Sequence, residues 1–589
     1  MACNDFMTIF ILPFKYFRFE ENGGAWHEGV VTAKDAADTL VKANPGGSKY
    51  TGWTRSYYQI DSPENYAEFN YFHRHVHDTI FMKDKGGEGS LPNAAGERNV
   101  NRNVAGRNQG MQFLTRGDYY EMTVRFYVEQ NDLNEAVKKT VTRTISVRVN
   151  SIDLHLYDNQ IGMLTITTEM KPGDEVSYDD FLRYNDVARR VYPPFLSERD
   201  NGIICKSYQT GPLKSEKKLL PSSVVLSHAS DEKKDIPEDF PSLRLPDDFP
   251  YLSDVVKGLL KPLECNNRDA KKYSSNIYYT PATDDRMFIV SYCRDDVRSS
   301  IMQSAGSSYP YKTSEDWYRF IFVDGGDASV QNDEMMKDLI KSHTYARWAN
   351  YGTFFGMSRY SFVVLCGTDQ YGGFHNILKQ HMKSMYYQIA LMGLFQRCML
   401  IKLAEDVDRL SERLQKEDIK VLAKESSNLR RDYISFINKY WHVEVTPQEQ
   451  GIEMYSQFMS ILALDRLYDE VHREIEELEE YVDNKIEFDT NQLGFETNNE
   501  VARITRYGLP LMLIALVFSV WQTLNGATSY YVEPIKCFVP GWFFVFLQLA
   551  AAAIAFVLIW CLLVWYMKRT RDKNKTDKDK NRTRICQRR

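Results

Sequence analysis

The sequence predicts an α+β cytosolic body, followed by long stalk helices and a C-terminal hairpin of two transmembrane helices. Three observations lead to this fold class. Strand patterns alternate with helix patterns up to residue 370, helical patterns continue from residue 371 onward, and two long apolar segments stand near the C-terminus. The chain has 589 residues, which is enough for several domains.

The apolar segments span residues 509–524 and 542–566, and neither contains a side chain that is charged at neutral pH. A run of about 25 residues that is apolar on every face is long enough to cross a bilayer, whereas the first segment is at the short end of that range. Two buried helices of a soluble core are the alternative. Such length without a polar face favours a membrane hairpin.

The charges that flank the hairpin predict its orientation. The tail at 568–589 carries eleven Lys or Arg residues and three Asp residues, whereas the connection between the spans has only Glu533 and Lys536. Because positive flanks stay in the cytoplasm, both termini are expected inside, with a multi-pass topology.

Charge and cysteine content exclude several classes of protein. The formal net charge is −6; the tail carries +8, so the rest carries −14. The body is therefore not expected to bind nucleic acid directly, whereas the tail suits an anionic lipid bilayer. Nine cysteines without a CxxC pair fit a reducing cytosol. The apolar stretch 6–14 lacks a preceding Lys or Arg and predicts a strand, not a signal peptide.

Pattern and composition divide the chain into six parts. They are an N-terminal α/β region (1–207), a Pro-rich linker (208–250), a second α/β region (251–370), a helical stalk (371–506), the hairpin (507–567) and the basic tail (568–589). The expected strands include 140–149, 152–157, 161–168, 287–292, 318–323 and 360–366, and the expected helices include 178–191 and 331–348.

Three helices are expected in the stalk, over 375–416, 418–441 and from Pro447 onward. Thr446 is the predicted N-cap of the third, with Glu449 completing a capping signature. A coiled-coil stripe follows in this helix, made of Leu464, Leu467, Val471, Ile475, Leu478 and Val482. If the helix continues to residue 524, it is about 117 Å long.

The order of these parts resembles the CorA superfamily of magnesium channels. In both, a long stalk helix continues into a first span, which is followed by a short outside loop, a second span and a basic tail. The segment Leu509–Ala515 is similar to the family's entry into the first span, and Val532–Pro534 to its acidic outside loop. The resemblance implies a pentamer whose first span lines the pore. The family's Gly-Met-Asn filter is replaced here by Ser519–Gln522, which places magnesium transport in doubt.

The body resembles a subgroup of CorA-like effectors found beside bacterial anti-phage systems, including type III CRISPR loci. The similar segments are Tyr157–Leu164, Tyr184–Pro194 and Tyr387–Arg397. This resemblance implies a homo-oligomeric channel in the bacterial inner membrane, opened by a small nucleotide messenger. That messenger is S-adenosylmethionine joined to AMP (SAM-AMP) or a cyclic oligonucleotide such as cyclic oligoadenylate. The alternatives are a constitutive transporter of Mg²⁺ or another divalent cation, and a membrane-anchored scaffold without a pore.

Two groups of residues are candidates for ligand binding. Arg189 and Arg190 suit bidentate contact with phosphate, and the subgroup resemblance adds Asn185; salt bridges to nearby aspartates are the alternative. His73, His75 and His77 would share one face of a strand and could bind zinc or a similar metal, against the alternatives of a solvated face or a ligand contact.

Two loops offer weaker signals. Residues 323–329 form a Gly-containing loop at a place where ligands often bind, but they lack GxGxxG. An Arg-containing loop at 83–109 could cover an anion, although its composition favours disorder.

Polar residues in the first span indicate a pore. Met512, Leu516, Ser519 and Thr523 recur on one face of the predicted helix, with Met512 and Leu516 as an apolar constriction. Helix packing without a pore is the alternative. No paired-carboxylate, Cys/His or Ser/His/Asp spacing typical of catalysis is present, so the sequence does not predict an enzyme.

Overall fold

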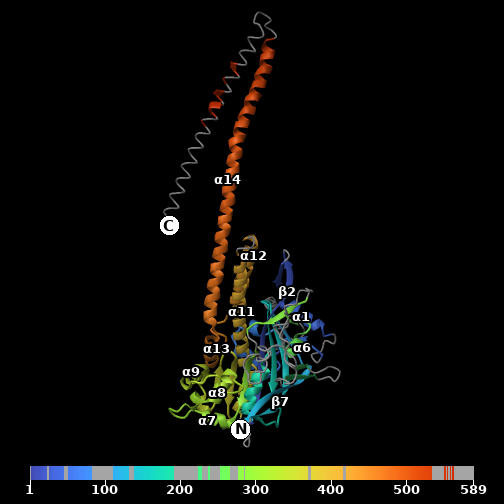
Figure 1. Cartoon of the computed structure of the whole chain (residues 1–589), viewed down its shortest axis with the longest axis vertical. Coiled ribbons are helices and arrows are strands. Elements are labelled where there is room, and N and C mark those ends of the chain that lie inside the picture. The colour runs from blue at the N-terminus through green and yellow to red at the C-terminus, as the bar shows by residue number, and fades with distance from the viewer. Residues whose placement is uncertain are drawn as a thin grey trace, which may run out of the picture. The chain divides into compact units, whose positions relative to one another are not determined.

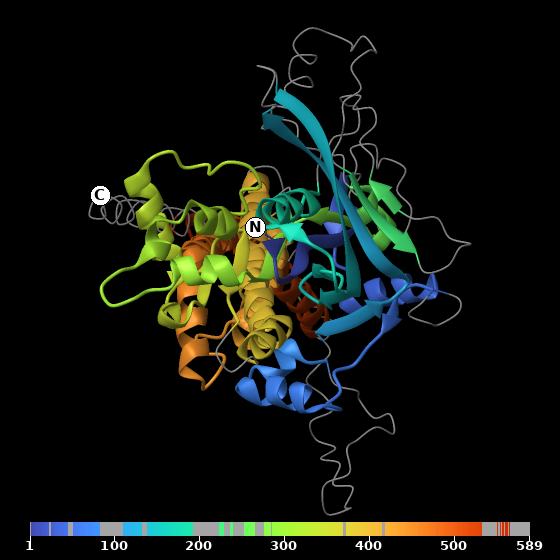
Figure 2. The same cartoon turned by 90° about the horizontal axis from the view of Figure 1, so that it is seen from below.

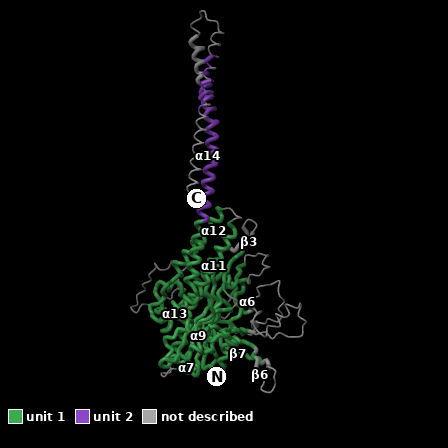
Figure 3. Tube along the Cα trace, turned by 60° about the vertical axis from the view of Figure 1, so that its left-hand side comes forward, with its two compact units in different colours: residues 1–480 green, residues 481–589 purple. Residues whose placement is uncertain are grey.

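The computed structural model divides the chain into two compact units, residues 1–480 and residues 481–589 (Figure 3). It describes residues 2–22, 25–44, 51–82, 110–131, 138–191, 223–228, 236–238, 253–265, 276–283, 286–368, 373–414 and 419–532, and scattered positions between 550 and 565. Side chains beyond residue 521 are described only at those scattered positions.

One mixed sheet of fifteen strands organises the described part of the first unit (Figures 1 and 2). Its main path runs β11-β10-β6-β7-β8-β2-β14-β17-β16-β15. These strands are β2 (Asp5–Asn22), β6 (Tyr119–Asn131), β7 (Lys138–Tyr157), β8 (Ile161–Glu169), β10 (Ser223–His228), β11 (Ile236–Glu238), β14 (Phe288–Arg294), β15 (Thr344–Tyr345), β16 (Phe354–Met357) and β17 (Ser361–Cys366). Beside the path lie β3 (Ala25–Gly29), β4 (Thr54–Arg55), β5 (Met111–Arg116), β12 (Glu264–Cys265) and β13 (Tyr278–Pro281); β1 (Ala2–Cys3) and β9 (Val176–Ser177) form a separate pair.

The pattern of buried side chains explains why these segments form strands of one sheet. Strand β7 alternates, so that Ile152, Leu154 and Leu156 share one buried face. Strands β14 and β17 are parallel neighbours with almost every residue buried, as expected for strands covered on both faces. Because β14 also pairs with β2, the two predicted α/β regions contribute to one sheet. The expected linker contains strand β10, which pairs with β6.

Helices pack around this sheet. In the N-terminal part they are α1 (Ala33–Lys42), α2 (Pro63–Tyr71), α3 (His77–Ile80), α4 (Tyr178–Ala188) and α6 (Asp254–Leu260). The central part has α7 (Asp296–Met302), η3 (Pro310–Thr313), α8 (Glu315–Phe322), α9 (Asp333–His343) and η4 (Ala349–Tyr351). The helical part has α10 (Phe374–Lys383), α11 (Met385–Arg413), α12 (Ile419–Tyr440), α13 (Glu449–Ile461) and α14 (Leu464–Val532).

The prediction of a strand over 318–323 was wrong, because residues 318–322 belong to helix α8 and Val323 is its C-cap residue. The Ser314 hydroxyl accepts a hydrogen bond from the Trp317 amide and caps the helix, and acidic residues fill its first turn. Of the aromatic residues that suggested a strand, Tyr318 and Phe320 are buried in the core and Phe322 is partly buried, and Trp317 and Ile321 are buried one turn apart. Capping therefore outweighs strand propensity here.

The stalk contains two breaks that the sequence did not predict. The expected helix over 375–416 divides at Ser384, whose backbone has φ −119° and ψ −93°. The third helix begins at Glu449 instead of Pro447, and it ends before Ala463, whose φ is 55°. The coiled-coil stripe is confirmed from Leu464 onward: all its residues except Leu467 are buried.

Helix α14 continues for 69 residues and contains Pro510. Within the part of the chain that the structure describes, Leu464–Ser519 is the one stretch that is long and apolar enough to cross a membrane, judged by length and composition; its most apolar window has a mean hydropathy of 1.5 and is not buried. The second expected span, 542–566, lies largely outside the described residues, so the two-helix hairpin stays a prediction.

Candidate functional site

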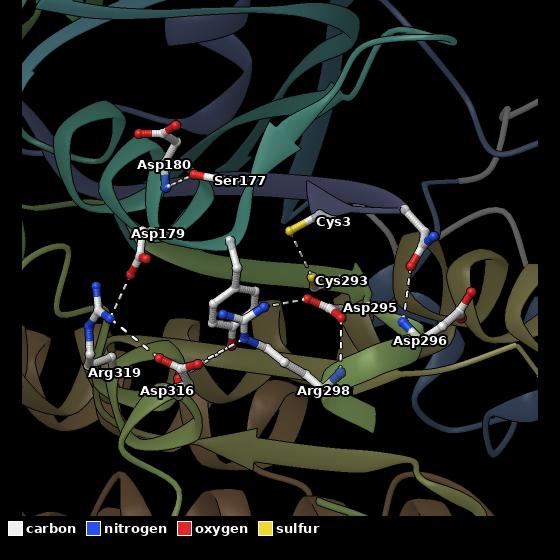
Figure 4. Close-up of polar contacts among 12 residues, drawn as sticks. Cys3, Ser177, Asp179, Asp180, Cys293, Asp295, Asp296, Arg298, Asp316 and Arg319 are labelled. Carbon is white, nitrogen blue, oxygen red and sulfur yellow. Dashed lines mark hydrogen bonds and ion pairs between the residues drawn. The ribbon is translucent and has the colours of Figure 1, made fainter. Parts of the chain in front are cut away.

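Helix α4 carries or directly precedes the predicted ligand-binding residues. The Ser177 hydroxyl accepts a hydrogen bond from the Asp180 amide at 3.1 Å, and the acidic residues of the first turn suit the positive end of the helix dipole (Figure 4). The expected helix over 178–191 is therefore confirmed as far as Ala188. Its last turn carries Asn185, and Arg189 is its C-cap residue.

Asn185 is fully buried. Its Oδ1 accepts a hydrogen bond from the Thr8 hydroxyl at 2.8 Å, and Thr8 in turn contacts the Ser291 hydroxyl at 2.8 Å. Its Nδ2 has no hydrogen-bond partner among the described residues. A buried amide donor without a partner costs about 1–3 kcal/mol, so this atom is available to an acceptor that enters the site.

Arg189 is also buried, with 1% of its surface exposed. Its Nη2 lies 3.4 Å from Asp186 Oδ1 and donates to the Val323 carbonyl at 3.3 Å. Its Nε and Nη1 have no partner among the described residues. Burial lowers the pKa of the guanidinium, although Asp186 opposes the shift. The buried cation therefore has donors to spare for an anion.

Arg190 makes the ion pair that the alternative hypothesis expected. Its Nη2 lies 2.9 Å from Asp186 Oδ2, and its Nε donates to the Asp186 carbonyl at 3.2 Å. Burial by itself raises the pKa of Asp186, but Arg190 and Arg189 outweigh it and lower the pKa below its ordinary value. The Asp186 carboxylate thus forms ion pairs with two guanidinium groups, and Arg286 adds a third positive charge nearby.

The loop that begins at Val323 lies against this turn of α4. Val323 adopts a left-handed backbone with φ 57°, which is strained for a β-branched residue. A Cβ added at Gly325 would lie 2.9 Å from Asp186 Cβ and 3.1 Å from Arg183 Cα, so only glycine fits. A Cβ added at Gly326 would meet nothing within 4 Å. We call the last turn of α4, Arg189, Arg190 and residues 323–326 the α4 corner.

Ion pairs hold the elements around the α4 corner. Arg319 Nη1 lies 2.8 Å from Asp179 Oδ1 and 3.5 Å from Asp316 Oδ1, which joins α4 to α8 (Figure 4). Arg298 Nε lies 2.8 Å from Asp316 Oδ2, and its Nη1 lies 2.8 Å from Asp295 Oδ2. Neither arginine was predicted from the sequence to be functional, because an isolated Arg in a helix has no local mark of such a network.

The α4 corner is suited to bind an anion. Three guanidinium groups stand near the carboxylate of Asp186, and Arg189 also lies near Asp324, whose pKa is raised by burial. Unpaired N–H donors from Asn185 and Arg189 match acceptors such as phosphate oxygens. Sequence reasoning weighed the arginines and the 323–329 loop separately, and the structure brings them together.

The histidines do not lie on a strand. Residues 73–76 form a turn that leads into α3, and His77 is buried with its Nε2 3.0 Å from the Phe72 carbonyl. His73 Nε2 lies 2.9 Å from Glu444 Oε1. The His75 ring stacks against His73 and meets the ring of His442 at 5.2 Å. Across the described residues, no group of three or more His, Cys, Asp or Glu side chains could hold a metal ion.

Residues of the Tyr387–Arg397 segment, which carries part of the subgroup resemblance, lie on α11 and connect stalk helices. The buried Gln396 donates to the Tyr440 carbonyl at 2.9 Å and to the Tyr455 hydroxyl at 3.1 Å. Arg397 donates to the carbonyl of Leu462. These contacts give the motif a structural role.

The predicted pore residues lie on α14. Met512 and Leu516 are 72% and 60% exposed, and Ser519 is exposed as well. Thr523 belongs to the same helix, but its side chain lies outside the described residues. Their spacing places the four positions along one helical face. The Arg-containing loop at 83–109 also lies outside the described residues.

Comparisons with protein-family models, with curated proteins and with solved structures found no match to this chain.

Proposed function

We propose that this chain is a ligand-gated membrane channel of CorA-like architecture, opened by a nucleotide messenger that binds at the α4 corner. The observation that carries the proposal is the set of buried donors without partners on Asn185 and Arg189, beside a glycine loop. A phosphate group accepts from such donors, and each hydrogen bond to a charged group contributes about 1.5–3 kcal/mol.

The remaining parts of the proposal rest on the sequence. The channel is a homo-oligomer, a pentamer by resemblance, in the bacterial inner membrane, with two spans and both termini in the cytoplasm. It acts as an anti-phage effector, and SAM-AMP or a cyclic oligoadenylate is its messenger. Opening requires that the messenger bind the open arrangement more tightly than the closed one.

Binding is tested with the purified full-length chain and SAM-AMP or cyclic oligoadenylate. Arg189→Gln and Asn185→Leu remove the proposed donors, and each should weaken binding about 10-fold to 100-fold. Arg431→Gln removes an equal charge from the exposed face of α12 and should leave affinity unchanged. Equal affinity in folded Arg189→Gln protein would remove the assignment.

Flux from liposomes separates the candidate functions. Leak that depends on the nucleotide supports the proposal. Magnesium flux without a nucleotide supports a constitutive transporter, for which the acidic residues of α14 (Glu474, Glu476, Glu477, Glu479, Glu480) are suited. The absence of any flux supports a scaffold without a pore.

The pore face is tested by cysteine accessibility. Ser519→Cys and Thr523→Cys, in a background where the exposed Cys561 is replaced by Ser, should react with a water-soluble thiol reagent when the nucleotide is present. Val517→Cys lies on the opposite face of the helix and is the control. Unreactive cysteines at both test positions in conducting channels would show that this face does not line the pore.

A further inference from the structure

The turn between β16 and β17 contacts both the α4 corner and the end of α13. The turn consists of Ser358, Arg359 and Tyr360. Ser358 N donates to the Ser361 carbonyl at 2.8 Å, and both serine hydroxyls donate to the Ile321 carbonyl. These bonds fix the backbone of the turn against α8, and the side chains of Arg359 and Tyr360 extend from it toward solvent.

Tyr360 connects the turn to the α4 corner. The guanidinium carbon of Arg189 lies 5.7 Å from the centre of the Tyr360 ring, which is within range of a cation–π contact. The backbone repeats the connection through β14. Met287 N donates to the Arg189 carbonyl at 2.6 Å, and Ile289 N donates to the Tyr360 carbonyl at 3.0 Å. Arg189 is therefore connected to Tyr360 in two ways, through the cation–π contact and through the backbone hydrogen bonds of residues 287 and 289.

Arg359 connects the turn to the end of α13. Its Nε donates to the Ile461 carbonyl at 3.4 Å, and Arg397 donates to the next carbonyl, that of Leu462. Carbonyls at a helix C-terminus lack partners within the helix and carry a partial negative charge, so two cations stabilise this end. Burial and the charge of Arg359 lower the pKa of Arg397, as expected for two cations that share one site.

The joint that these arginines hold is strained. Leu462 is the buried C-cap residue of α13, and Ala463 follows with φ 55°. This left-handed conformation costs an alanine about 1–2 kcal/mol. The amide of Leu467 donates to the Ala463 carbonyl at 3.1 Å and begins the hydrogen bonding of α14. A strained residue between two helices is a place where two arrangements can be close in free energy.

We propose that Tyr360, Arg359 and Arg397 form a relay that couples occupancy of the α4 corner to the α13–α14 joint. A ligand that takes up the free donors of Arg189 changes the contact between its guanidinium and Tyr360. The turn then shifts Arg359, which changes its bond to the Ile461 carbonyl and its repulsion of the Arg397 guanidinium on α11. Arg397 in turn changes its bond to the Leu462 carbonyl, and the backbone at Ala463 responds. This regulatory role rests on the proposed binding of a nucleotide at the α4 corner.

Hydrogen exchange of the joint tests the relay. In the wild-type chain, saturating SAM-AMP or cyclic oligoadenylate should change the exchange rate of amides 463–467 about fivefold or more. Tyr360→Leu should keep nucleotide affinity within about threefold and abolish this response, because it removes the ring without touching the donors of Arg189. Arg397→Gln should do the same from the other end of the relay. Tyr351→Leu, which removes an exposed tyrosine outside the relay, should respond like the wild type.

A response at 463–467 that persists in both Tyr360→Leu and Arg397→Gln would overturn the relay, and so would its loss in Tyr351→Leu. A chain that binds no nucleotide would instead contradict the proposed function. In that case the relay is tested by hydrogen exchange in the absence of nucleotide. Asp186→Asn, which loosens Arg189, should change exchange at 463–467 in the wild-type background and not in Tyr360→Leu. Equal changes in both backgrounds would overturn the relay by itself.

Discussion

Asp186 Oδ2 lies 2.9 Å from Arg190 Nη2, and the other oxygen of the same carboxylate lies 3.4 Å from Arg189 Nη2. The α4 corner thus depends on one buried anion to offset two cations. Replacing one partner of a buried ion pair leaves the other charge uncompensated, and the cost reaches about 3–5 kcal/mol. This relationship makes Asp186 the most sensitive position of the corner.

Asp186→Asn should lower the free energy of unfolding at pH 7 by about 2–3 kcal/mol, since Arg189 keeps its contact with Val323. The pKa of Asp186 is lowered in the folded chain, so its stabilising effect is present above the carboxyl pKa of the unfolded chain. The effect disappears as the pH falls through the lowered pKa. Urea denaturation at pH 7 measures the difference, and Asp338→Asn, at an exposed position of α9, should cost less than about 0.5 kcal/mol.

Gly393→Ala should destabilise the stalk by about 1–3 kcal/mol. A Cβ at this position would lie 2.7 Å from the Phe458 ring, where α11 and α13 approach each other closely. Helix propensity alone favours alanine by about 1 kcal/mol, so the steric effect must exceed this gain. Gly494→Ala in α14 is the matched control, because its added Cβ meets nothing within 4 Å. Thermal unfolding should show a lower midpoint for the first variant and an equal or higher midpoint for the second.

The chain should lose stability in mild acid through His442. Burial and the nearby His75 lower its pKa from 6.5 to about 4. Between these values the unfolded chain binds a proton that the folded chain does not, so stability falls as the pH falls. The expected contribution is about 2 kcal/mol between pH 7 and pH 5.

His442→Gln can keep the contact with the Thr79 hydroxyl, and it should flatten the pH dependence of the unfolding free energy by that amount. His472→Gln, at a half-exposed position, should leave the dependence as it is in the wild type. An identical pH dependence in the His442→Gln variant and in the wild type would show that folding does not lower the pKa of this ring.

Gln396→Leu should cost about 2–3 kcal/mol, because it leaves the buried Tyr440 carbonyl without its side-chain donor and the Tyr455 hydroxyl with one partner fewer. Gln450→Leu removes a comparable bond to the Tyr386 hydroxyl at a half-buried position, and its cost should stay below about 1 kcal/mol. The urea midpoint of Gln396→Leu should therefore be lower than that of Gln450→Leu. Equal midpoints would indicate that the bonds of Gln396 are replaced by water.

Local patterns in the sequence determined many elements of this fold. Period-two alternation predicted β7, continuous apolar runs predicted β14 and β17, and heptad spacing predicted the buried stripe at the beginning of α14. The apolar segment 509–524 predicted a membrane span, and the described stretch Leu464–Ser519, which includes its beginning, is long and apolar enough to cross a membrane. Each of these signals comes from residues within one or a few turns of each other.

Only the tertiary structure decided how these elements meet. The helix over 315–322 and the break at Ala463 depend on a cap and on a strained backbone angle that apolar spacing does not encode. The contact of Arg189 with Val323 joins residues 134 positions apart in the chain, and nothing in either local segment specifies the other. Such contacts form because the free energy gained by burying both segments against one sheet exceeds the conformational entropy lost by ordering them. Both terms depend on the whole fold and cannot be read from either segment alone.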